Sequence, residues 1–215
     1  MTTIKNSDQA LEIFKDGGEV AIDAALEDKL GIEGVLKDIP ILNVAISLYK
    51  AGNQISAYFF AKKMITFLAE INKVPSHTRI DFLNQNCSDE SGVENVGEVA
   101  LMILDKIDHP KLAAMLGRAF ALLTIGAIGK QEFDIYAHII KNLNPYLQRQ
   151  MAQCYKIKGM MAVDAPTAQL LANYGLLKVE YKLNSSSNSL ALSSINTSHL
   201  GEKFYTEILV GRTTY

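Results

Sequence analysis

The spacing of apolar residues changes once along this chain, and that change limits the folds it can adopt. Over most of residues 8–156, apolar side chains recur every three or four positions, as on the buried face of a helix. Residues 176–183 (LLKVEYKL) instead alternate between apolar and polar, and a second apolar run, residues 190–195, follows a polar stretch. Alternation with a period of two is typical of a half-buried strand. We therefore predict a mainly α-helical protein with one β-hairpin near its end.

Proline, glycine and capping residues divide the helical part into segments. We expect Asp108 to cap the helix that begins at Pro110 and Ser198 to cap the last helix of the chain. The helix from Pro110 is apolar almost all round, which indicates the centre of a bundle. The sequence thus predicts a helical bundle over residues 1–144 and a second module over residues 145–215. The helices expected in these two parts include residues 54–72, 110–128, 130–143, 145–156 and 166–173.

Composition favours a cytoplasmic protein. The chain has 215 residues, of which 48% are hydrophobic and 20% charged, and this is enough for one core and a smaller second one. Its net charge of -2 gives no general attraction to nucleic acid or anionic lipid. The first residues lack the apolar core of a signal peptide, and Cys87 and Cys154 lie far apart. We expect reduced thiols and no cofactor.

The end of the chain resembles the C-terminal half of bacterial winged-helix domains. The likeness rests on residues 170–183 (LLANYGLLKVEYKL) and 190–209 (LALSSINTSHLGEKFYTEIL). A helix in that family ends in a step into the wing, here Tyr174-Gly175-Leu176. After the returning strand come a serine or threonine, a glycine and an aromatic residue, here Ser198, Gly201 and Phe204. The resemblance implies the order helix, helix, hairpin, helix, in which the hairpin is the wing.

Winged helices commonly bind DNA by laying the helix before the wing into the major groove. In this chain that helix, residues 165–174, contains neither Lys nor Arg, and residues 145–215 have only a small excess of positive charge. Because DNA affinity grows with the number of phosphates neutralised, we favour a module that docks a protein or is structural. A DNA-binding transcriptional regulator is the alternative, and its contacts would be Thr167, Gln169, Asn173, Lys178 and Lys182.

A second likeness concerns the first third of the chain. Residues 30–71 resemble the opening of a family of small bacterial helical proteins that are often encoded among mobile-element and phage-defence genes. The shared features are the step Asp38-Ile39-Pro40 and a run of lysines, aliphatic residues and an aromatic over residues 62–68. This resemblance implies a biological role in bacterial or phage conflict. It implies no particular reaction or mechanism.

Residues 39–71 form an apolar helical hairpin in the sequence pattern, and two roles are open to it. We favour the core of the bundle. An exposed hairpin would instead bind a partner, or insert into a membrane interface with its lysines at the headgroups. The residues of that surface would be Ile41, Ile46, Tyr58, Phe59, Lys62 and Lys63.

No group of residues has the spacing of a catalytic or metal site. Asp105, Asp108 and His109 could offer metal ligands, but we assign Asp108 to a cap and Asp105 to an exposed helix side. The pair Asp134 and His138 has the spacing of a surface ion pair on one helix face. The glycine-rich residues 126–130 follow a helix where a phosphate loop would follow a strand, so we interpret them as a helix break.

These observations predict a non-enzymatic interaction or regulatory protein that binds another protein, with homo-oligomers left open. The DNA-binding regulator is the second hypothesis. A membrane-active effector that exposes residues 39–71 is the third and least favoured.

Overall fold

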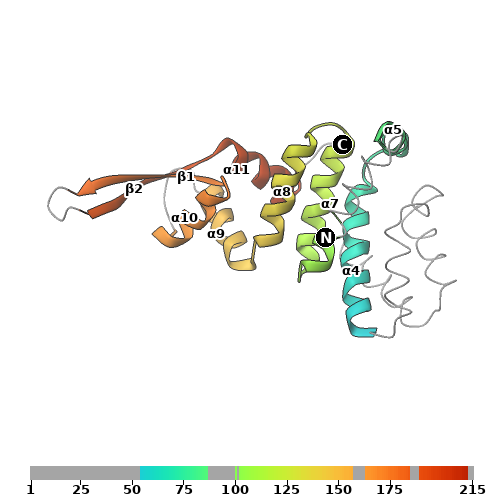
Figure 1. Ribbon diagram of the computed structural model, residues 1–215, viewed down its shortest axis with the longest axis horizontal. Helices are drawn as coiled ribbons and strands as arrows, with labels where there is room; N and C mark the ends of the chain where they lie inside the picture. Colours follow the sequence, from blue (N-terminus) through green and yellow to red (C-terminus); the bar gives the residue numbers. More distant parts are fainter. Residues whose placement is uncertain (1–53, 87–99, 101, 157–162, 185–188, 213–215) are drawn as a thin grey trace. The chain divides into compact units, whose positions relative to one another are not determined.

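A computed structural model of the chain describes residues 54–86, 100, 102–156, 163–184 and 189–212. This part is mainly helical with one antiparallel hairpin, as the apolar spacing predicts (Figure 1). It divides into two compact units, and the boundary between Ala137 and His138 lies within helix α8 (Lys130–Asn142). Each unit is described by itself. The expected helices before residue 54 and the first helical turn expected after Ser91 lie outside the described residues.

Helices α4 (Gln54–Ile71) and α7 (Pro110–Thr124) pack against each other in the first unit. Six consecutive residues of α7, 112–117, are buried, so this helix has no fully exposed face in its first turns. The burial confirms α7 as a core helix. On α4, Met64, Phe67 and Leu68 are buried, and the Phe67 ring lies edge-on to Phe120 of α7, with centroids 5.8 Å apart. Helix α5 (Ser76–Asn86) also contacts α7 and places Phe82 edge-on against Phe120, with ring centroids 6.1 Å apart.

Gly117 lies where the backbone of α7 packs closely against α4. A Cβ atom added there would stand 2.5 Å from the carbonyl oxygen of Phe67 and 2.9 Å from the Cβ of Glu70. Glycine inside a helix costs about 1 kcal/mol relative to alanine. The close approach of the two backbones explains why the chain has glycine here.

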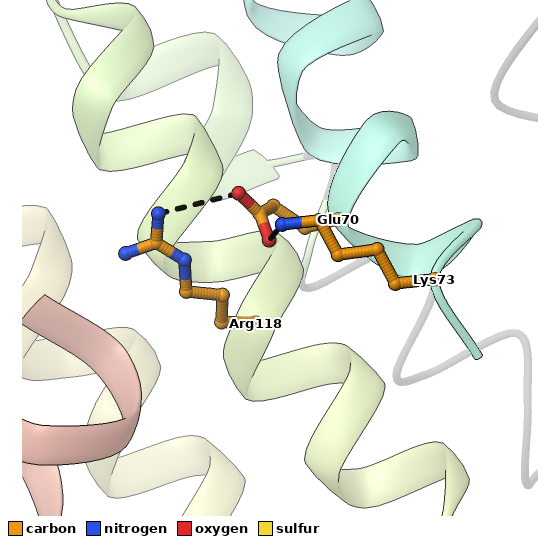
Figure 2. Close-up of polar contacts among 3 residues, drawn as sticks. All are labelled: Glu70, Lys73 and Arg118. Atoms are coloured by element: carbon orange, nitrogen blue, oxygen red, sulfur yellow. Dashed lines mark hydrogen bonds and ion pairs between the residues drawn. The ribbon is translucent and has the colours of Figure 1, made fainter. Parts of the chain in front are cut away.

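Arg118, the next residue, forms an ion pair that links the same two helices. Its Nη2 lies 3.2 Å from Oε1 of Glu70, a buried carboxylate on α4 (Figure 2). The other carboxylate oxygen of Glu70 accepts a hydrogen bond from Nζ of Lys73. A buried charge needs a partner because its desolvation is otherwise uncompensated. Glu70 therefore explains how an arginine can occur in the middle of an apolar helix.

Both ends of α7 differ from the sequence prediction. The residue that caps its start is His109 and not Asp108, and Nδ1 of His109 accepts a hydrogen bond from the Lys111 amide at 3.1 Å. The helix ends at Thr124 and not at residue 128, because Gly126 takes a left-handed conformation with φ of 71°. Glycine adopts this conformation without steric cost. The interpretation of residues 126–130 as a helix break is confirmed.

The second unit contains α9 (Pro145–Lys156), α10 (Ala165–Asn173) and the hairpin of β1 (Leu177–Asn184) and β2 (Ser189–Thr197). The strands pair from Leu177 opposite Thr197 to Asn184 opposite Ser189. Glu180 lies opposite Ser194 and Tyr181 opposite Leu192, so Ser193 is an extra residue, a β-bulge in β2.

The predicted helix starts in this unit are confirmed. Asn144 Oδ1 accepts from the Leu147 amide at 2.8 Å, at the start of α9. Ser198 caps α11 (His199–Lys203) by accepting from the Gly201 amide at 2.9 Å. The chain then continues as a π-helical segment, η1 (Phe204–Val210), where the sequence predicts one regular helix. It ends at Gly211, whose φ is 76°.

The hydroxyl group of Tyr155, on α9, joins both ends of the hairpin. It donates to the carbonyl of Leu176, just before β1, and accepts from the amide of Ser198, just after β2, at 3.3 Å. Its ring stacks on that of Tyr205, with centroids 5.2 Å apart. Burial raises the pKa of Tyr155, so the hydroxyl keeps its proton and can donate.

We expect Gly117→Ala to destabilise the protein by about 1–3 kcal/mol, because the added methyl group must push α4 and α7 apart. The gain in helix propensity offsets only about 1 kcal/mol of this cost. Urea unfolding followed by circular dichroism measures the change. Gly129→Ala is the matched control, since its Cβ would meet nothing within 4 Å. Equal stability of Gly117→Ala and the wild type would contradict the close packing.

We expect Tyr155→Phe to loosen the hairpin by about 1–3 kcal/mol, because the Leu176 carbonyl and the Ser198 amide each lose a buried partner. Amide hydrogen exchange should become faster along β1 and β2. Tyr205→Phe is the control, because it also removes a hydroxyl and keeps the stacked ring. Unchanged exchange in Tyr155→Phe would show that other contacts hold the hairpin.

Candidate interaction surface

The hairpin has one apolar and one charged face. Alternation along β1 places Leu177, Val179, Tyr181 and Leu183 on one face and Lys178, Glu180 and Lys182 on the other. Glu180 accepts a hydrogen bond from the Ser194 hydroxyl of β2 at 2.8 Å. The hairpin is therefore an amphipathic ribbon.

Helix α10 covers only the base of the apolar face. Leu177 is 3% exposed, whereas the exposed fraction rises to 42% at Tyr181 and 62% at Leu183. The Tyr181 hydroxyl donates to Gln169 Oε1 of α10 at 2.7 Å, which shows that this face is turned toward α10. Beyond that contact the hairpin extends past the helix (Figure 1). We name Tyr181, Leu183 and Leu192, the half-buried residue opposite Tyr181, the distal hairpin face.

The residues predicted to contact DNA do not gather on one surface. Lys178 and Lys182 are exposed on the charged face of the hairpin, whereas Gln169 lies on α10, at the apolar face. Gln169 also donates to the Asn173 side chain at 2.9 Å. The lysines therefore point away from the helix that a winged-helix protein lays into the groove.

Thr167 is not available for a base contact, contrary to the prediction. Its side chain is buried, and its hydroxyl lies 3.3 Å from that of Tyr146. Its amide donates to Oδ1 of Asp164, the cap of α10, and this bond holds the pKa of Asp164 below its usual value. Thr167 thus belongs to the start of the helix.

The surface predicted around residues 39–71 is described only in part. Ile41, Ile46 and the side chain of Tyr58 lie outside the described residues. Phe59 is 55% exposed, and Lys62 is half-buried. No helix in the described ranges is long and apolar enough to cross a membrane.

Lys63 was predicted on that surface and is instead a buried structural residue. It is 8% exposed, and its Nζ donates to the carbonyl oxygens of Asp105 and Ile107, at 3.2 and 2.9 Å. Burial lowers its pKa, and the nearby Asp105 and Asp108 carboxylates act in the opposite direction. The ammonium group satisfies carbonyls at a helix end and cannot face a headgroup.

The other residues considered for chemistry are dispersed. Asp105 and Asp108 are exposed, and in the described ranges no three His, Cys, Asp or Glu side chains gather as metal ligands. Burial raises the pKa of the Cys154 thiol, which disfavours the thiolate. The ring of His138 packs against that of Tyr174, with centroids 6.2 Å apart.

No protein-family model matches the chain, and searches of curated proteins and of solved structures found no match either.

The apolar alternation predicts the strand over residues 176–183 but not the exposure of its end. The available signal was length, because the apolar alternation continues to Leu183 while α10 has only 9 residues, Ala165–Asn173. A helix rises 1.5 Å per residue and a strand about 3.3 Å. A helix this short cannot cover all of an eight-residue strand that runs beside it.

We expect Lys63→Met to cost about 1–3 kcal/mol, because two buried carbonyls lose their donor. The unfolded chain binds the proton of Lys63 more strongly than the native state does. The wild type should therefore gain stability relative to Lys63→Met as the pH rises through the lowered pKa toward 10.5. Urea unfolding at neutral and alkaline pH tests both statements. Lys62→Met is the control, and an equal effect of the two variants would contradict the buried role.

Proposed function

We propose that the chain is a non-enzymatic, cytoplasmic interaction protein whose second unit is a winged-helix-like module that docks protein. The docking surface is the distal hairpin face. The observation that carries this proposal is the exposure of Leu183, 62%, at the end of an apolar face that α10 covers only at its base. Apolar side chains left exposed together on one face are a candidate contact surface for another protein.

The element order supports the winged-helix likeness. Helices α9 and α10, the hairpin and α11 follow one another as the resemblance implies. The Ser198 hydroxyl donates to the carbonyl of Gly175, at the end of α10, at 2.5 Å, and so closes the base of the wing. Gly175 has a φ of 73°, which favours glycine at the step into β1.

The charge distribution favours protein over DNA as the partner. Helix α10 has no Lys or Arg, and Lys178 and Lys182 lie on the opposite side of the hairpin from it. A groove-bound helix needs side chains that reach base edges and cations that reach phosphates together. We also propose that the protein acts in bacterial or phage conflict. This part of the proposal is based only on the resemblance of residues 30–71.

A site-specific photo-crosslinker tests the docking surface in cells that produce the chain. A benzophenone side chain at position 183 should give protein adducts, and the same group at the exposed position 202, on α11, should give far fewer. Tyr181→Asp should remove the adducts of position 183, because it places a charge in an apolar contact. Equal crosslinking from both positions would contradict docking by this face.

Retardation of duplex DNA at low salt tests the alternative. We expect none. Retardation that weakens with salt and disappears in the double variant Lys178→Glu with Lys182→Glu would establish DNA binding in place of the proposed function. Lys203→Glu, on α11, reverses one lysine charge elsewhere in the unit and serves as the control for a general charge effect.

A further inference from the structure

We infer that the protein that docks at the distal hairpin face is a second copy of this chain. The β1 strands of the two copies pair antiparallel, edge to edge, with Tyr181 opposite Tyr181, so that the two distal hairpin faces meet side by side. This inference rests on the proposed docking function and names its partner. The pairing would turn two hairpins into one four-stranded sheet.

The outer edge of β1 is the edge that such pairing would use. In the described part of the chain the sheet has only two strands, so β1 has a strand on one side only. An open edge presents a row of backbone donors and acceptors that another strand can satisfy. A two-stranded hairpin is only marginally stable alone, and further strands with an apolar face stabilise it.

The charges on β1 select one register. With Tyr181 on the two-fold axis, Glu180 of each copy lies opposite Lys182 of the other, so two opposite-charge pairs form. A shift that places Glu180 on the axis puts Glu180 opposite itself and Lys178 opposite Lys182. A shift that places Lys182 on the axis puts Lys182 opposite itself. Both of these neighbouring registers place like charges opposite each other, which is destabilising.

A register centred on Val179 would also pair Lys178 with Glu180. It would, however, use Leu177, which is 3% exposed, and would leave Leu183 beyond the strand of the other copy. The register centred on Tyr181 uses the exposed half of β1. The paired segment then spans residues 179–183 of both copies.

The apolar residues fit the same register. Val179 of one copy lies opposite Leu183 of the other, and the two Tyr181 rings are neighbours across the axis. Aromatic and aliphatic cross-strand pairs of this kind stabilise antiparallel sheets. The apolar faces of the two hairpins join on one side, and the ion pairs lie on the other side. The sequence of β1 is therefore self-complementary in an antiparallel pair, both in its charges and in its apolar residues.

Charge reversal provides the test, with sedimentation equilibrium as the measurement. The wild type should show a concentration-dependent dimer. Glu180→Lys and Lys182→Glu should each weaken self-association by roughly tenfold, because two attractive pairs become repulsive. The double variant Glu180→Lys with Lys182→Glu should restore it. An equal mixture of the two single variants should form the mixed dimer, since each then meets its complement.

Lys178→Glu is the matched control. It changes the same charge on the same face, but its opposite residue in this register is the uncharged Asn184. It should leave the dimer unchanged. Circular dichroism of each variant shows that it folds, and the mixed dimer excludes unfolding of the single variants as the cause of their weak association.

A wild-type monomer at the highest soluble concentration overturns this inference, and so does a dimer that ignores the charge reversals. In either case protein adducts of position 183 would still support the proposed docking function, with a different protein as the occupant. DNA retardation that depends on Lys178 and Lys182 would instead overturn the proposed function, whatever the oligomeric state.

Discussion

The Tyr155 hydroxyl is the polar contact on which the second unit depends. It bonds to the backbone at both ends of the hairpin and so fixes β1 and β2 to α9 at one point. Gly201 lies against it with no room for a side chain, and the stacked Tyr205 covers its ring. Because the base is held in this way, the distal half of the hairpin can extend beyond α10 and keep its apolar face exposed. The contact at the base therefore accounts for the exposure of Tyr181 and Leu183 in the distal half.

Local signals allowed much of the fold to be predicted, and distant contacts account for most of the errors. Ser198 caps α11 through a bond to the amide three positions away, so the sequence alone reveals it. Lys63 reaches carbonyls 42 and 44 positions away, and a pair of adjacent lysines looks like a solvated edge until those carbonyls are in place. The need for glycine at position 117 could not be predicted either, because it arises from the close contact with α4 and not from the sequence around it. His109 replaced Asp108 as a cap because both residues can accept from an amide and only the backbone decides which one stands at the helix start.

The sequence was enough to predict which residues of β1 share the candidate surface, but not how much of that surface α10 covers. The absence of cations from residues 165–174 already argued against a DNA-reading helix. The alternation of β1 fixed which side chains share a face, but not how far α10 extends over them. The exposed fractions of Tyr181 and Leu183 supply that missing length. They locate the proposed protein contact at the distal half of the hairpin.

The bulge at Ser193 limits the proposed assembly to two copies. A hairpin has two edges, and if both accepted strands, successive copies could add without limit and form a fibre. The extra residue in β2 interrupts its ladder, and a bulged strand bends and twists away from a flat partner. Association through β1 uses the regular edge of each copy and leaves the two bulged edges outside. The same ribbon would therefore close after two copies, and a single serine would separate a discrete complex from an aggregate.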